Sequence, residues 1–140
     1  MDIRRNDGPL VVEHNGTATT RFLVEKEELR QETMGGYLEL VSRFTLAPGS
    51  KLEPHSHDSD ELYYLLEGQA KMRVDDEIST LNPGDLVRIP PNAIHSIWPA
   101  NDGEPITALA MGFSYMPADR VGYTAYPDNG EPRWVPHGED

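Results

Sequence analysis

The chain has 140 residues, enough for one domain with its own hydrophobic core. Its 24 acidic and 12 basic residues give a net charge of -12, which disfavours nucleic acids and anionic membrane surfaces as partners because both repel an acidic protein. There is no cysteine, which excludes disulfides, iron–sulfur clusters and thiolate zinc sites. No segment approaches the length of a membrane span and the start lacks the apolar region of a signal peptide, so we expect a cytoplasmic protein.

Turn residues divide the chain into short apolar segments. Residues 1–16 are polar and are expected to form an arm with a short strand at Leu10–Glu13. Further strands are predicted at Thr17–Glu25, Tyr37–Thr45, Glu61–Glu67, Gln69–Val74, Ile78–Leu81, Leu86–Ile89, Ala93–Trp98 and Ile106–Phe113. Short strands at such regular spacing are typical of an all-β sandwich or barrel. We therefore predict a single domain over residues 1–140, with a barrel core at about 17–115 and a C-terminal extension at 116–140.

Two histidines and a glutamate stand close together before one of these strands. His55 and His57 are two residues apart, so on a strand they point to the same face. Glu61 would lie about 13 Å from His57 on one straight strand, at roughly 3.3 Å per residue, too far to share an ion. Residues 58–60 (Asp-Ser-Asp) are turn formers and predict a reversal that brings Glu61 back beside both histidines. Two imidazoles and a carboxylate suit a divalent transition metal ion.

A fourth ligand would have to come from elsewhere in the chain. The remaining histidines are His14, His95 and His137. His14 lies in the expected arm and His137 in the C-terminal extension, whereas His95 follows a Pro-Pro turn at the start of a predicted strand. We therefore favour His95.

The spacing of these residues resembles that of the cupins. Residues 49–68 read Gly-x5-His-x-His-x3-Glu-x6-Gly, as in the first cupin motif, and residues 84–95 read Gly-x5-Pro-x-Asn-x2-His, similar to the second. Asn92 stands where glycine is usual, and asparagine tolerates the left-handed backbone that such a turn needs. Pro99 stands where an asparagine often closes the motif, a position outside the ligand set.

The resemblance implies a fold, a metal site and a range of functions. The fold would be a double-stranded β-helix, or jelly-roll barrel, with His55, His57, Glu61 and His95 around one divalent ion. Fe(II) is the first choice, with Mn(II), Ni(II) or Zn(II) as alternatives. Four protein ligands on an octahedral ion leave two positions open, which favours a dioxygenase acting on a small oxygenated metabolite. Cupins also include lyases, decarboxylases, isomerases, cyclases and non-catalytic binding proteins, so these alternatives stay open.

Several other residues are candidates for the pocket. Tyr63 lies two residues beyond Glu61 on the same face of the strand, as either a general acid or base or a pocket wall. A tyrosine at this offset also occurs in cupin lyases that cleave dimethylsulfoniopropionate, where it is the base. Arg88 could bind a substrate carboxylate or form a surface ion pair. Three further residues are expected in the core or the pocket lining: Trp98, Met111 and Phe113.

The strand that carries Glu61 is apolar on both faces. Leu62, Tyr64 and Leu66 alternate with the side chains that should face the barrel interior. A strand that is apolar on both faces is covered on both, by a second sheet or by another copy of the chain. We therefore expect a homodimer that acts on a small-molecule substrate.

Overall fold

The computed structural model describes residues 1–13, 15–25, 28, 36–115 and 122–136. The elements that these residues define are the strands β1 (Asp2–Arg4), β2 (Val11–Glu13), β3 (Ala18–Thr20), β4 (Tyr37–Leu46), β5 (His55–Ser56), β6 (Ser59–Glu67), β7 (Ala70–Val74), β8 (Glu77–Leu81), β9 (Leu86–Ile89), β10 (His95–Pro99), β11 (Ile106–Ser114), β12 (Gly122–Ala125) and β13 (Arg133–Pro136). Within the described ranges, no helix is long and apolar enough to cross a membrane.

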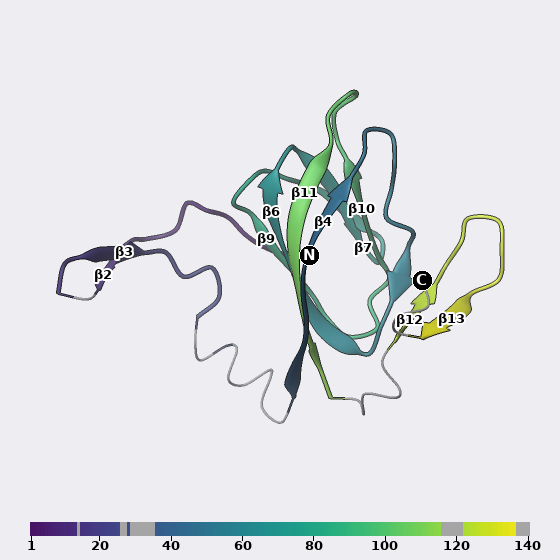
Figure 1. Ribbon diagram of the computed structural model, residues 1–140, viewed down its shortest axis with the longest axis horizontal. Helices are drawn as coiled ribbons and strands as arrows, with labels where there is room; N and C mark the ends of the chain where they lie inside the picture. The colour runs from purple at the N-terminus through teal and green to yellow at the C-terminus, as the bar shows by residue number, and fades with distance from the viewer. Residues whose placement is uncertain (14, 26–27, 29–35, 116–121, 137–140) are drawn as a thin grey trace.

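Two antiparallel sheets form the body of the molecule (Figure 1). One has the strand order β1-β9-β6-β11-β4 and the other β13-β12-β5-β10-β7-β8. Apolar side chains from both sheets pack between them, and the largest are fully buried: Leu65, Met72, Leu81, Ile89, Ile97 and Ile106. Burial of each such side chain contributes about 2 kcal/mol. The predicted all-β jelly-roll barrel is confirmed.

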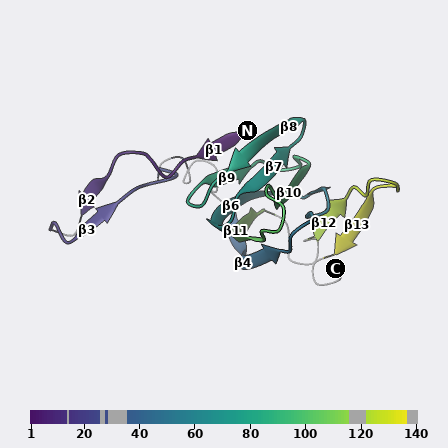
Figure 2. The same cartoon turned by 90° about the horizontal axis from the view of Figure 1, so that it is seen from above.

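The two ends of the chain differ from the expected arm and extension. β1 lies within residues 1–16, yet it pairs with β9 and forms an edge of the five-stranded sheet. β2 and β3 pair with each other as a separate two-stranded sheet, which both views show at a distance from the barrel (Figures 1 and 2). β12 and β13 lie in the extension, and they continue the six-stranded sheet beyond β5.

Small residues on β11 leave space inside the barrel. Ala110 lies opposite Tyr63 and Gly112 lies opposite Glu61 in the β11–β6 ladder. A methyl group added to Gly112 would come within 3.3 Å of the Leu40 side chain on β4. Larger residues at these positions would fill the space beside Glu61, so the short side chains of β11 are what keep a cavity open there.

Candidate metal centre

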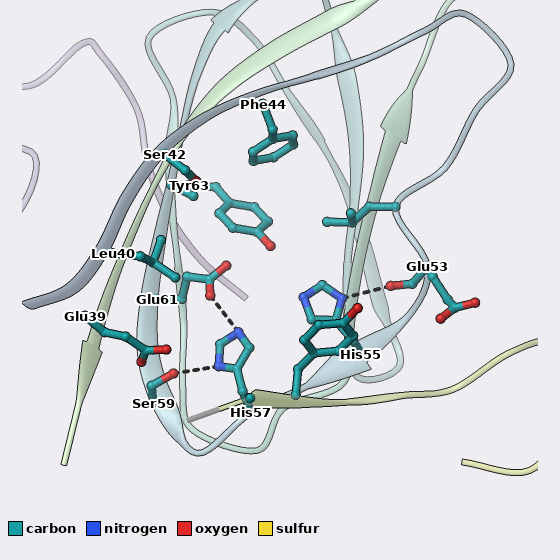
Figure 3. Close-up of a pocket in the computed structure, with 14 residues that line it drawn as sticks. Glu39, Leu40, Ser42, Phe44, Glu53, His55, His57, Ser59, Glu61 and Tyr63 are labelled. Atoms are coloured by element: carbon teal, nitrogen blue, oxygen red, sulfur yellow. Dashed lines mark hydrogen bonds and ion pairs between the residues drawn. The ribbon is translucent and has the colours of Figure 1, made fainter. Parts of the chain in front are cut away.

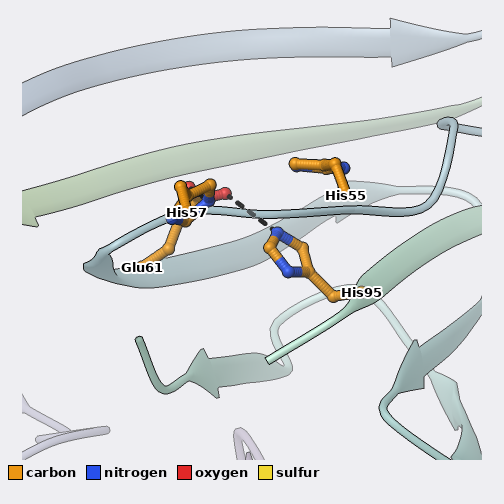
Figure 4. A group of neighbouring side chains, drawn as sticks. All are labelled: His55, His57, Glu61 and His95. Atoms are coloured by element: carbon orange, nitrogen blue, oxygen red, sulfur yellow. Dashed lines mark ion pairs between the residues drawn. The ribbon is translucent and has the colours of Figure 1, made fainter. Parts of the chain in front are cut away.

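His55, His57, Glu61 and His95 converge inside the barrel (Figure 4). His55 is in β5, and β10 places His95 directly opposite it in the ladder. The chain bends at Asp58 and β6 starts at the next residue, which brings Glu61 back beside the histidines. The predicted approach of Glu61 to the histidines is therefore present, but a bend between strands of different sheets produces it and not a turn between neighbouring strands. His14 and His137, the other two histidines considered, lie outside the described residues.

The four side chains are within reach of a single ion. One ligand atom from each lies within 4.8 Å of the others. Glu61 Oε2 is 2.6 Å from His57 Nε2, and Glu61 Oε1 is 3.9 Å from His95 Nε2. Three nitrogens and one carboxylate oxygen make a donor set that suits divalent transition metals.

The hydrogen bonds of the three imidazoles select the nitrogen that faces the cluster. The Nδ1 atoms of His55 and His95 donate to backbone carbonyls, of Glu53 at 2.8 Å and of Ala93 at 2.9 Å. Since a carbonyl can only accept, each Nδ1 carries the proton and each Nε2 keeps a free lone pair. His57 Nδ1 bonds the Ser59 hydroxyl at 2.8 Å.

Two of the Nε2 atoms are buried without a hydrogen-bond partner, those of His57 and His95. His57 Nε2 is nevertheless held in an ion pair with Glu61 Oε2, 2.6 Å away, so His95 Nε2 is the atom left unsatisfied. An unsatisfied buried polar atom costs about 1–3 kcal/mol. A metal ion between these atoms would remove that cost, so the residues present fit a resident divalent ion, with outer hydrogen bonds of the kind that orient metal-binding histidines.

A left-handed turn sets the position of His95. Asn92 has a φ of 65°, so the conformation expected from its place in the second motif is present. Its backbone N–H donates to the His57 carbonyl at 2.8 Å. The turn thereby ties the strand that carries His95 to the segment that carries His57.

The electrostatics of the cluster favour neutral imidazoles at two positions. Burial lowers the pKa of His55, and burial together with the neighbouring His55 lowers the pKa of His95 to about 3. Burial also acts to lower the pKa of His57, but its contact with Glu61 outweighs burial and raises that pKa above its ordinary value. Burial would raise the pKa of Glu61, yet its contact with His57 lowers it. The metal-free site is therefore a His57–Glu61 ion pair flanked by two neutral imidazoles.

A cavity of about 440 Å³ opens beside the cluster (Figure 3). Most of its wall is apolar or aromatic, and the described residues that line it are Glu39, Leu40, Ser42, Phe44, Leu52, Glu53, His55, His57, Ser59, Glu61, Tyr63, Ala110, Gly122 and Tyr123. His95 is fully buried beneath it. This is the size and character of a site for a small molecule.

Tyr63 is a buried part of this cavity wall. Its ring packs edge-on against Phe44, with the centroids 5.3 Å apart. Burial raises the pKa of Tyr63 well above its usual range, and the Glu61 charge adds to the effect. The phenol is therefore protonated at neutral pH and can serve as a hydrogen-bond donor in the cavity.

The β12–β13 hairpin supports the histidine strand. β5 has only two residues, and β12 pairs with it through Ala125 opposite His55. The Tyr126 N–H donates to the Pro54 carbonyl at 2.7 Å. The Tyr126 hydroxyl bonds that of Ser56 at 3.1 Å. These contacts restrain the strand on the side away from β10.

The same hairpin forms part of the cavity wall. The Tyr123 ring is edge-on to that of His55, with 5.6 Å between centroids. Outside the cavity, Arg133 on β13 pairs with Glu53 at 3.2 Å. This arrangement was not predictable from the sequence, because residues 116–140 lack the periodicity that would place Tyr123 on a strand. By contrast, the alternation of β4 could have indicated Leu40 and Phe44.

Four residues expected near the pocket lie elsewhere. Arg88 is on the opposite face of the sheet, where it pairs with Asp2 of β1 at 3.3 Å. Met111 and Phe113 alternate along β11 with Ala110 and Gly112, which lie opposite the inward-facing Tyr63 and Glu61. Strand alternation therefore directs the Met111 and Phe113 side chains outward, away from the cavity. Trp98 likewise alternates with the buried Ile97. None of the four is among the described lining residues.

The family assignment agrees with this geometry. The sequence profile of the cupin domain matches residues 42–112, which include all four candidate ligands. The chain belongs to the cupin superfamily. A cupin-like protein of Thermotoga maritima has a similar structure, with a TM-score of 0.51 and 22% identity over 69% of this chain and 63% of that one. This likeness concerns the fold.

Two curated proteins are similar to this cupin over part of their length. An uncharacterized protein of Methanocaldococcus jannaschii is 34% identical over 73 residues, which are 51% of this chain and 58% of that protein. Quercetin 2,3-dioxygenase of Bacillus subtilis is 41% identical over 49 residues, which are 34% of this chain and 14% of the enzyme. The matched region thus spans little more than half of one relative and a small part of the other.

Proposed function

We propose that this cupin is a mononuclear non-haem Fe(II) dioxygenase that acts on a small oxygenated metabolite. The observation that carries the proposal is the cluster of three histidines and one carboxylate beside an open, mostly apolar cavity of about 440 Å³. The local similarity to quercetin 2,3-dioxygenase supports the choice of dioxygen chemistry. A bound divalent ion with four protein ligands would supply two open positions at which a substrate and dioxygen can be activated.

The residues around the ion would have distinct tasks. The three histidines and Glu61 hold it, and the backbone carbonyls of Glu53 and Ala93 keep two imidazoles in the ligating tautomer. Leu40, Phe44 and Leu52 line the cavity and would exclude water from a bound substrate. The cavity thus has a metal-binding end and an apolar wall. A substrate with oxygen donors at one end and a compact apolar body would fit both.

A redox-neutral reaction is the second candidate, and Tyr63 favours it. Its side chain is buried in the cavity wall, which it shares with Glu61. A protonated phenol in this place could exchange a proton with a substrate, as a lyase, decarboxylase or isomerase requires. A dimethylsulfoniopropionate-lyase-like elimination is one such reaction, and a cupin that binds a small molecule or metal without catalysis is the remaining alternative.

Oxygen uptake separates these functions. The purified protein should contain close to one transition metal per chain by elemental analysis. Protein loaded with Fe(II) should consume dioxygen when it is mixed with one member of a panel of catechols, flavonols and hydroxy acids. Anaerobic turnover of a panel member by protein loaded with Mn(II), Ni(II) or Zn(II) would instead indicate the redox-neutral reaction.

Matched variants test the site itself. His57→Ala and His95→Ala should each lose most of the metal, whereas His14→Ala, a histidine outside the ligand set, should retain it. Full occupancy in both site variants would refute the metal centre. Tyr63→Phe should keep the metal and the oxygen uptake of a dioxygenase, but it should lose most of the turnover of a redox-neutral enzyme.

A further inference from the structure

A β-bulge turns Glu39 of β4 into the cavity. Gly112 of β11 pairs with Leu40, and the next residue of β11 pairs with Leu38, so Glu39 is the extra residue between them. From Leu40 onward, alternate residues of β4 line the cavity, and this alternation would point Glu39 outward. Glu39 nevertheless lines the cavity together with its neighbour Leu40. A bulge has this effect, because it re-aims one side chain of a strand.

The Glu39 carboxylate lies beside the metal ligands without being one of them. Figure 3 shows it next to Ser59 and His57, and its side chain is partly exposed. Burial acts to lower the pKa of His57, and the charges of Glu61 and then of Glu39 act to raise it. Glu39 is not in the group of four whose ligand atoms converge. It therefore places a negative charge within electrostatic range of the metal centre.

The charged residues of the cavity wall are of one sign. Apart from the ligand Glu61, the acids of the described lining are Glu39 and Glu53, and no lysine or arginine is among the described lining residues. Glu53 pairs with Arg133 at 3.2 Å, and Figure 3 shows its side chain directed away from His55. The charge of Glu53 is thus countered outside the cavity, and Glu39 is the carboxylate that acts on a molecule inside it.

The metal end of the cavity would have the opposite charge. Histidines bind a metal ion as neutral imidazoles. A divalent ion held by three of them and by Glu61 would therefore have one net positive charge. This end attracts an anionic oxygen donor, whereas Glu39 attracts a cation and repels a second anion. Such a separation of charge favours a molecule with oxygen donors at one end and a cationic group at the other.

We propose that Glu39 determines specificity and that the substrate carries a protonated amine. The inference rests on the proposed function, because the metal ion would hold the oxygen atoms of the substrate. The ammonium group would donate hydrogen bonds to the Glu39 carboxylate. The apolar body between the two ends would lie against Leu40 and Phe44, which line the cavity on the same strand.

Three catechols that share one metal-binding end test this specificity. At neutral pH, dopamine is a cation, 4-ethylcatechol is neutral and 3,4-dihydroxyphenylacetate is an anion. Anaerobic titration into Co(II)-loaded protein, followed by the Co(II) absorption spectrum, gives their dissociation constants without turnover. Dopamine should bind about tenfold more tightly than 4-ethylcatechol, because it gains a hydrogen bond to a charged group. The anion should bind about tenfold more weakly than 4-ethylcatechol, because Glu39 repels it.

Substitutions of Glu39 should change the order of the three affinities. Glu39→Gln should bring the three dissociation constants within about twofold of one another, and Glu39→Lys should reverse their order. Glu67→Gln is the matched control, since it removes the same charge from an exposed position of β6 outside the described cavity lining. It should keep the order of the wild type. General damage to the site would weaken all three catechols alike, whereas loss of a charge contact changes their order.

The Co(II) dissociation constant, measured first, separates this inference from the proposed function. A wild-type protein that does not bind Co(II) would refute the metal centre and the proposed function with it. A protein that binds Co(II) but none of the three catechols would overturn the inference about the substrate. Tighter or equal binding of the anion by wild type, or the wild-type order in Glu39→Gln, would overturn the role of Glu39 and leave the metal centre intact.

Discussion

Two hairpins flank the barrel, and they differ in what they bury. β12–β13 joins the six-stranded sheet through β5, and its Ala125 and Val135 side chains are buried. β2–β3 makes its own two-stranded sheet and leaves Val11 and Val12 exposed. Both are short antiparallel pairs, so strand propensity does not separate them. A hairpin is therefore held in the folded chain by the apolar side chains that it buries and not by its own strand pairing.

The hairpins also stand in different relations to the metal centre. β12–β13 is hydrogen-bonded to the strand of His55 and lines the cavity with Tyr123. β2–β3 is a separate sheet that projects away from the barrel (Figure 1). A change in the first hairpin should therefore affect metal binding, whereas a change in the second should leave metal binding unaffected.

The largest expected difference between the hairpins is in the effect of a valine-to-aspartate substitution on stability and metal binding. Val135→Asp places a charge at a buried position and should lower the free energy of unfolding by about 3 kcal/mol. It should also weaken Co(II) binding at least tenfold, because β5 loses its support. Val12→Asp should change the Co(II) dissociation constant less than twofold. Equal effects of the two on metal binding, measured by titration, would show that β12–β13 does not support the site.

The pH dependence of stability should follow the site and not the N-terminal hairpin. The pKa of His95 falls from 6.5 to about 3 on folding, so between these values the unfolded chain binds the extra proton. Stability of the metal-free protein is therefore fully present above pH 6.5 and is lost as the pH falls toward 3. Between pH 7 and pH 5 this one group accounts for a loss of about 2 kcal/mol.

Urea unfolding at each pH measures this loss. His95→Gln should flatten the dependence, even though it lowers stability at neutral pH. Val12→Lys should keep the slope of the wild type when both are measured at a concentration at which they are monomers. A wild-type slope in His95→Gln would assign the dependence to other groups.

A smaller change tests one contact of the β12–β13 hairpin. Tyr126→Phe removes the hydroxyl that bonds Ser56 and should lower stability by about 1 kcal/mol. It should weaken Co(II) binding several-fold, since Ser56 lies between the two histidines. Ser56→Ala should have a similar effect. The double variant should be no worse than either single one, and additive losses would show that the two hydroxyls act independently.

The clustering of His55, His57, Glu61 and His95 was predictable because two motifs with fixed local spacing carry these residues. A bend between His57 and Glu61, and a left-handed turn at Asn92, follow from the residue types and are both present. The strands of residues 37–114 other than β5 were likewise predicted, from their apolar content and the turns between them. The cytoplasmic location and the absence of a nucleic-acid partner stay predictions.

The pocket wall was less predictable because it depends on the phase of each strand and on distant partners. Met111 and Phe113 were expected inward, but the register with β6 directs Ala110 inward instead. Arg88 was considered as a substrate ligand because nothing local reveals that β1 would pair with β9 and supply Asp2. The β4–β11 ladder is also irregular at Gly112/Phe113, which shifts the inward and outward alternation of the β4 side chains.

The smallest expected contrast lies in two asparagines with the same backbone conformation. Asn15 in the β2–β3 turn has a φ of 56° and Asn92 before His95 has a φ of 65°. Alanine in this region costs about 1 kcal/mol more than asparagine, because its side chain cannot hydrogen-bond locally. Asn92→Ala should therefore lower the free energy of global unfolding by about that amount.

Asn15→Ala should change the same free energy by less than about 0.5 kcal/mol, since a hairpin with few buried contacts opens by itself before the barrel unfolds. Amide hydrogen exchange separates the two cases: Asn15→Ala should speed exchange only within β2 and β3, whereas Asn92→Ala should speed it throughout the barrel. Because the Asn92 N–H is bonded to the His57 carbonyl, only that variant should also weaken Co(II) binding. A global effect of Asn15→Ala would mean that β2–β3 is part of the folding unit of a single chain, and the two hairpins would then differ in position but not in kind.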